Sequence, residues 1–243
     1  MDAISTYLSK PWTRFYEPGT PPTADVPSKS VPQAFDEATE RFAGKTALFF
    51  HGRAIGYREL RESVDRLAGA FARLGLKKGD RLALYLLNSP QFVIAYFAAL
   101  KCGCVVTPIS PVYTSHEVRF QLENSGARAV VCQDILLENI RRSGAKLDHV
   151  VVTSISEYLP SLKRFFDRMF NGSGRHDPGQ VSNVHRFQAL LAQGDGPPEV
   201  SIDPATNGAK PPGRNFAAQT PPRPSSVRAN LPLATPATRA PAP

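Results

Sequence analysis

The stretch LKKGDRLALYLLNSPQFVIAYFAALKCGCVVTP, residues 76–108, decides the fold class. A lysine, glycine and aspartate turn leads into RLALYLL, residues 81–87, which is apolar on successive positions, as in a strand covered on both faces. The triplet NSP, residues 88–90, predicts a helix start, with a capping side chain and then proline where its missing N–H is harmless. The helix extends to Lys101, and CVVTP, residues 104–108, predicts the next strand.

The same alternation continues after this stretch. Thr114 and Glu117 form a T-x-x-E capping box, which predicts another helix. ARAVVC, residues 127–132, predicts a third strand, and HVVVT, residues 149–153, predicts a fourth after a helix capped by Asp134. Strands that alternate with helices at this spacing are joined by right-handed crossovers. The predicted fold class is therefore α/β, a mostly parallel sheet flanked by helices.

Three elements are predicted before this stretch. The segment 31–44 has an amphipathic helical pattern, and TALFFHGRAIGY, residues 46–57, predicts a β-hairpin about His51 and Gly52. Residues 56–75 form the clearest helix, because apolar side chains recur on one face. That face contains Leu60, Val64, Leu67, Phe71 and Leu74.

Composition restricts the classes of function. The formal charge is +8, but five Lys or Arg and no acid lie in residues 207–243, so the remainder carries 24 basic against 21 acidic residues. This distribution argues against nucleic-acid binding.

Cys102, Cys104 and Cys132 have no paired CxxC spacing, which predicts small buried residues and no disulfide framework. With no secretory pattern and no apolar run long enough to span a bilayer, the sequence predicts a cytoplasmic protein.

Five pieces of the chain carry a resemblance to a known family. They are YRELRESVDRLA, KKGDRLAL, NSPQFVIAYFAALKCG, PISPVYTSHEV and NSGARAVV, in that order between residues 57 and 131. Together they resemble the N-terminal part of the adenylate-forming (AMP-binding) acyl-CoA synthetases. Residues 149–166 and 184–206 further resemble the long-chain fatty acid branch of that superfamily.

The resemblance implies a two-step ligase reaction. In that family a fatty acid carboxylate attacks the α-phosphate of ATP, giving acyl-adenylate and pyrophosphate, and the thiol of coenzyme A then displaces AMP. The family uses ATP, Mg²⁺ and coenzyme A. A Gly, Ser and Thr-rich loop ending in Pro-Lys-Gly holds the triphosphate, because small residues let backbone N–H groups approach it closely.

The sequence after Thr206 departs from the family pattern. It contains Gly-Ala-Lys followed by Pro211 and Pro212, which lack N–H groups and make a phosphate cradle implausible. Of the 37 residues 207–243, 23 are Pro, Ala, Arg or Gly, a composition that predicts disorder. We therefore predict a catalytically incompetent fragment with no catalytic, cofactor-binding or metal-binding residues of its own. A truncation or frameshift after Thr206 would explain the sequence of residues 207–243, and a natural Pro-rich linker is the alternative explanation.

The predicted organisation has three parts. Residues 1–29 are an N-terminal extension, residues 30–206 are a partial N-terminal domain of a synthetase, and residues 207–243 are the tail. The five histidines are scattered without metal-ligand spacing, so no metal is assigned. NGSGRHDPG, residues 171–179, lacks the ending of a phosphate loop and predicts a surface loop.

Residues 158–170 have the pattern of a basic amphipathic helix. Its apolar residues include Leu162, Phe165, Phe166 and Met169, with basic residues between them. Such a helix predicts peripheral contact with the inner face of a membrane, and packing against another part of a synthetase is an equal alternative. As a class of function, the alternative to an enzyme fragment is a noncatalytic module that pairs with an intact synthetase or a membrane surface.

Overall fold

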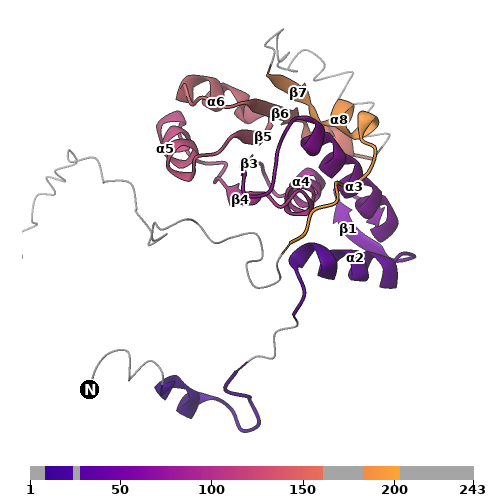
Figure 1. Cartoon of the computed structure of the whole chain (residues 1–243), viewed down its shortest axis with the longest axis vertical. Helices are drawn as coiled ribbons and strands as arrows, with labels where there is room; N and C mark the ends of the chain where they lie inside the picture. Colours follow the sequence, from indigo (N-terminus) through magenta and orange to yellow (C-terminus); the bar gives the residue numbers. More distant parts are fainter. Residues whose placement is uncertain (1–8, 24–27, 161–182, 203–243) are drawn as a thin grey trace, which may run out of the picture. The chain divides into compact units, whose positions relative to one another are not determined.

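Five parallel strands form the central sheet of the protein (Figure 1). Our computed structural model describes residues 9–23, 28–160 and 183–202, all within one unit of the chain, residues 1–210. The spatial order of the strands is β4-β3-β5-β6-β7, and every neighbouring pair is parallel. The strands are β3 (Arg81–Tyr85), β4 (Val105–Pro108), β5 (Ala129–Gln133), β6 (His149–Thr153) and β7 (Val184–Arg186). The predicted α/β class with a mostly parallel sheet is confirmed.

Helices cover both faces of this sheet, as the alternation of strands and helices predicts. On one face, Leu82 and Leu84 of β3 belong to a core shared with α2 (Val31–Arg41), α3 (Tyr57–Arg73), α4 (Pro90–Lys101) and α8 (Phe187–Gln193). On the other face, Ala83 and Tyr85 belong to a second core shared with α5 (Ser115–Ser125) and α6 (Leu137–Ser143). The successive apolar residues of β3 are explained by these two cores. Three short 3-10 helices complete the described elements: η1 (Pro11–Phe15), η2 (Asp134–Leu136) and η3 (Ile155–Tyr158).

The predicted hairpin is present. It consists of β1 (Thr46–Phe50) and β2 (Arg53–Gly56), which pair antiparallel. The turn residues His51 and Gly52 have φ values of 49° and 93°. Two consecutive positive φ values suit the twist of a two-residue hairpin turn, which explains the glycine.

One predicted helix cap and one predicted helix start differ from the structure. Ser89 is the N-cap residue of α4, but its side chain makes no capping hydrogen bond. Asp134 does accept a hydrogen bond from the N–H of Ile135, but it begins the short helix η2, and α6 starts only at Leu137. By contrast, Thr114 and Glu117 form the complete capping box that the sequence predicts.

After α8 the chain runs back along α3 in a segment that we call the strap, residues 194–202. Lys78 Nζ donates a hydrogen bond of 2.7 Å to the Ser201 carbonyl. The strap lies so close to α3 that a Cβ on Gly69 would be 2.2 Å from the Gly196 oxygen, and one on Gly194 would be 2.1 Å from the Arg66 oxygen. Glycine at positions 69 and 194 is therefore required for this contact.

Candidate functional site

Among the described strands, the order changes direction once, between β3 and β5, and this is a topological switch point. The chain leaves β3 to form β4 on one side and then returns to form β5 on the other side. In open α/β sheets, ligands bind at the carboxyl ends of the strands at such a point. The candidate site is therefore the carboxyl edge of β3, β5 and β6, where the residues following each strand meet.

A glutamine side chain joins two strands at this edge. Gln133, the last residue of β5, is fully buried, and its Oε1 accepts a hydrogen bond of 3.0 Å from the backbone N–H of Leu87. Its Nε2 is buried without a hydrogen-bond partner among the described residues. Buried polar atoms are nearly always paired, either with protein groups or with ordered water, so this amide group has an unused donor at the switch point.

Two residues at the start of α4 show the same feature. Gln91 Nε2 donates a hydrogen bond of 2.7 Å to the Ser154 carbonyl, which follows β6. Gln91 Oε1 and Ser89 Oγ are buried, and within residues 9–23, 28–160 and 183–202 neither has a partner. We call Ser89, Gln91 and Gln133 the edge cluster. Its amide and hydroxyl groups can donate and accept hydrogen bonds, but they do not ionise near neutral pH, so the cluster can position a polar group and cannot act as an acid or base.

An ionisable carboxyl group lies beyond β6 at the same edge. Thr153 Oγ1 donates a hydrogen bond of 2.7 Å to Glu157 Oε2, and Gln188 Nε2 lies 3.2 Å from the same oxygen. Burial raises the pKa of Glu157 above its ordinary value, against the effect of these two hydrogen bonds. Burial also raises the pKa of Tyr158 to about 12.

This carboxyl group opens onto a groove of about 430 Å³ between α3, η3 and α8. The Arg53 guanidinium lies 5.2 Å from the centre of the Tyr158 ring and also pairs with Glu59. The charged side chains lining the groove are Arg53, Glu59, Glu62, Arg66 and Glu157. Two arginines and three glutamates line the groove, so its wall carries both signs of charge.

The thiols are unsuited to chemistry. Cys102, Cys104 and Cys132 are buried, and burial raises the pKa of each to about 12. Because the thiolate is the reactive form, these groups stay inert at neutral pH. The prediction that they are small buried residues is confirmed.

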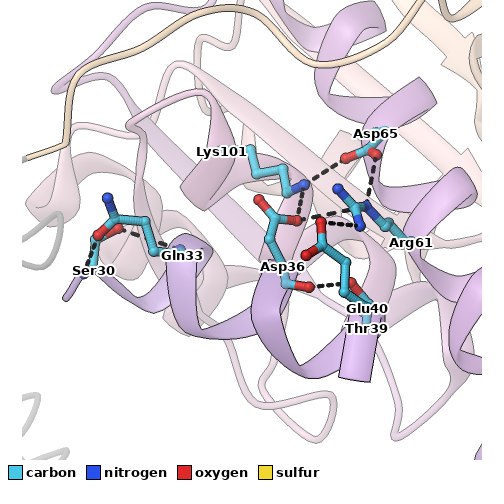
Figure 2. A network of polar contacts seen from close by, with 8 residues as sticks. All are labelled: Ser30, Gln33, Asp36, Thr39, Glu40, Arg61, Asp65 and Lys101. Atoms are coloured by element: carbon cyan, nitrogen blue, oxygen red, sulfur yellow. Dashed lines mark hydrogen bonds and ion pairs between the residues drawn. The ribbon is translucent and has the colours of Figure 1, made fainter. Parts of the chain in front are cut away.

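A second polar cluster joins α2, α3 and α4 (Figure 2). Lys101 Nζ lies 2.5 Å from Asp36 Oδ1 and 2.6 Å from Asp65 Oδ1, and only 6% of the lysine side chain is exposed. Arg61 approaches both carboxylates and pairs with Glu40 at 2.8 Å. We call Asp36, Arg61, Asp65 and Lys101 the helix network. Each charge is balanced within the network, which indicates a structural role.

The structure describes some, but not all, of the histidines and loop residues that the sequence analysis considers as site candidates. The structure brings His149 and His185 together, which histidine spacing in the sequence does not predict. No group of three or more potential metal ligands occurs among the described residues. Residues 171–179 and the apolar residues Leu162, Phe165, Phe166 and Met169 lie outside the described residues. The absence of catalytic, cofactor-binding and metal-binding residues stays a prediction.

The sequence matches the AMP-binding enzyme family over residues 35–190. The chain belongs to this family. A long-chain-fatty-acid CoA ligase of Bacillus subtilis (strain 168) is 29% identical over 187 residues, which are 76% of this chain and 33% of the relative. One of Escherichia coli O157:H7 is 32% identical over 161 residues, which are 64% of this chain and 28% of the relative. The chain thus spans about a third of the length of these relatives.

Solved structures agree on the fold. A long-chain-fatty-acid-CoA ligase from Archaeoglobus fulgidus superposes with a TM-score of 0.59 at 22% identity, covering 77% of this chain and 34% of that one. A benzoate CoA ligase from Burkholderia xenovorans LB400 gives a TM-score of 0.54 at 22% identity, covering 70% of this chain and 29% of that one. The sheet and its helices are therefore those of the N-terminal domain of acyl-CoA ligases. None of the helices in the described residues is long and apolar enough to cross a bilayer.

Proposed function

We propose that this chain corresponds to the N-terminal part of a ligase that activates a long-chain fatty acid. The reaction forms an acyl-adenylate from ATP and the fatty acid, and then transfers the acyl group to coenzyme A, with Mg²⁺ bound to the nucleotide. The observation that carries this proposal is the match to the AMP-binding family over residues 35–190, together with relatives that are long-chain-fatty-acid CoA ligases.

In this proposal the chain's own residues supply a scaffold and hydrogen-bonding groups. The unpaired amide and hydroxyl atoms of the edge cluster at the switch point bind polar groups of the ligand or of the rest of a ligase. Reacting groups come from elsewhere, because the edge cluster does not ionise. Residues 30–206 form the ligase-like part, preceded by the extension 1–29 and followed by the tail 207–243.

We further propose that the 243-residue polypeptide alone does not form acyl-adenylate. The triphosphate requires a loop of closely approaching backbone N–H groups, and residues 207–243 contain no Gly, Ser and Thr-rich loop ending in Pro-Lys-Gly. Removing a single transition-state donor slows enzymes by about 10² to 10³. Loss of a whole phosphate loop should therefore cost much more than one such factor, and we expect no acyl-adenylate above background from the chain alone.

A chimera tests the ligase assignment. Residues 1–202 are joined to the downstream two thirds of the Bacillus subtilis relative, and pyrophosphate release is measured with ATP and palmitate. The control is the relative's own N-terminal third rejoined at the same junction. We expect palmitate-dependent pyrophosphate release from both proteins and none from the 243-residue chain. A folded chimera that is inactive beside an active control contradicts the assignment.

The cellular setting follows from the same proposal. A fatty acid ligase of this kind works in the cytoplasm, with shallow contact of the segment containing Leu162, Phe165, Phe166 and Met169 with the membrane. Liposome flotation tests this contact in the chain and in its Phe165→Ser/Phe166→Ser variant. Equal flotation of the two contradicts it.

A noncatalytic role is the second candidate, and incompletely buried apolar side chains on α4 and the hairpin favour it. Phe92, Val93, Tyr96 and Phe97 of α4 are only partly buried, and the Phe49 side chain in the hairpin is 79% exposed. Such apolar surface fits an intact synthetase as partner. Pull-down of an intact long-chain ligase by the chain, and its loss in a Phe49→Ser variant, would support this role.

A further inference from the structure

Two histidines meet on the last two strands of the sheet. His149 is the first residue of β6, and His185 lies in the middle of β7. The register pairs Val151 with His185, so His149 lies two positions from His185 across the strands. Side chains two positions apart point to the same face of a sheet, and this brings His149 Nδ1 to 3.1 Å from His185 Nε2.

We propose that His149 and His185 form a two-ligand site for a late transition-metal dication such as Zn²⁺ or Ni²⁺. Imidazole nitrogen binds Zn²⁺ at about 2.0–2.1 Å, and tetrahedral geometry then separates two such nitrogens by about 3.4 Å. The observed 3.1 Å separation is that of a hydrogen bond, in which one of the two nitrogens carries the proton. To bind the ion through both nitrogens, that ring moves its proton to its other nitrogen, and the separation widens by a few tenths of an ångström.

The surroundings of the pair leave it open to an ion. Both histidines are partly exposed, so water can occupy the coordination positions that the protein leaves empty. Mg²⁺ and Ca²⁺ prefer oxygen ligands, so the site discriminates against them.

Metal binding here has a structural consequence. β7 has three residues, and among the described strands it pairs with β6 alone, at the edge of the sheet. It leads directly into α8, which packs against α3 and precedes the strap. An ion held by one histidine from each strand would therefore fasten β7, and α8 with it, to the remainder of the sheet.

Isothermal titration calorimetry of the full 243-residue chain tests the site. We expect Zn²⁺ and Ni²⁺ to bind with one micromolar event, Mg²⁺ to give none, and His149→Gln and His185→Gln each to abolish the event. His116→Gln is the matched control, because His116 lies exposed on α5, and it should retain the event. Circular dichroism without metal verifies that each variant is folded.

A second measurement does not depend on the variants. Substoichiometric Cu²⁺ added to the ¹⁵N-labelled wild-type chain should broaden amide signals around residues 149–151 and 184–186 before all others. The site is disproved if Zn²⁺ does not bind, if His149→Gln and His185→Gln bind as the wild type does, or if Cu²⁺ first broadens signals elsewhere.

Discussion

Lys101 Nζ lies 2.6 Å from Asp65 Oδ1, in a site where only 6% of the lysine side chain is exposed. Asp36 is the second carboxylate on this ammonium group, at 2.5 Å. A buried charge that loses its partners destabilises a protein strongly, whereas a balanced buried pair contributes little net stability. The main effect of the helix network is therefore to specify how α2, α3 and α4 pack against one another. Its net contribution to stability is small.

Removing both carboxylates should unbalance this network. The Asp36→Asn/Asp65→Asn variant should lower the free energy of unfolding by about 3 kcal/mol, the low end of the range for a broken buried pair, because Asp36 is 36% exposed. Lys29→Met is the control, since its pair with Glu37 is exposed and is worth about 0–1 kcal/mol. Urea denaturation measures both variants, and equal losses would show that the helix network is not buried in solution.

The strap should not tolerate a methyl group at position 69. A Cβ there would lie 2.2 Å from the Gly196 oxygen, so Gly69→Ala must displace the strap, at about 1–3 kcal/mol. Limited proteolysis should then cut residues 194–202 faster. Gly44→Ala, where a Cβ meets nothing within 4 Å, is the control. Unchanged cleavage in Gly69→Ala would mean that the strap does not lie on α3.

The edge cluster predicts a further loss of stability. Gln133→Leu removes the acceptor of the Leu87 N–H and leaves that group without its partner, which costs about 1–3 kcal/mol. Gln133→Glu keeps an acceptor oxygen at the same position, so it should retain the bond and lose stability mainly from the buried charge at neutral pH. Its deficit should shrink in acid as the carboxyl group protonates, and a pH-independent deficit would argue against a buried position.

Glu157 should make stability depend on pH. Its pKa in the folded protein is raised, mainly by burial, from an ordinary value of 4.5. The stability that protonated Glu157 contributes to the folded protein is thus fully present below about pH 4.5. This stability is lost as the pH rises through the pKa of Glu157 in the folded protein. Compared with the wild type, Glu157→Gln should be relatively more stable at pH 7 than at pH 4. Thermal melts at the two pH values measure this difference, and the opposite sign would contradict the raised pKa.

The regular elements were predictable because their signals are local. The stripe from Leu60 to Leu74 and the capping box of Thr114 depend on residues a few positions apart, and the structure contains both elements. β7 was not predicted as a separate strand, because its three residues VHR carry no alternation and gain their hydrogen bonds only from the edge of β6.

The candidate site depends on contacts that the sequence does not show. Serine is a typical helix-capping residue, yet the hydroxyl of Ser89 is buried and makes no capping hydrogen bond to α4. Gln133 ends an apolar strand, and a polar residue at that position was the one available signal. His149 and His185 are 36 residues apart and meet only because β7 pairs with β6.

Mass spectrometry of the purified 243-residue chain, after incubation with ATP, Mg²⁺ and palmitate, measures whether the chain alone forms acyl-adenylate. An intact long-chain ligase treated identically is the positive control. We predict palmitoyl-AMP from the intact ligase and none above background from this chain. Formation of palmitoyl-AMP by the chain alone, at a rate proportional to its concentration, would contradict the account.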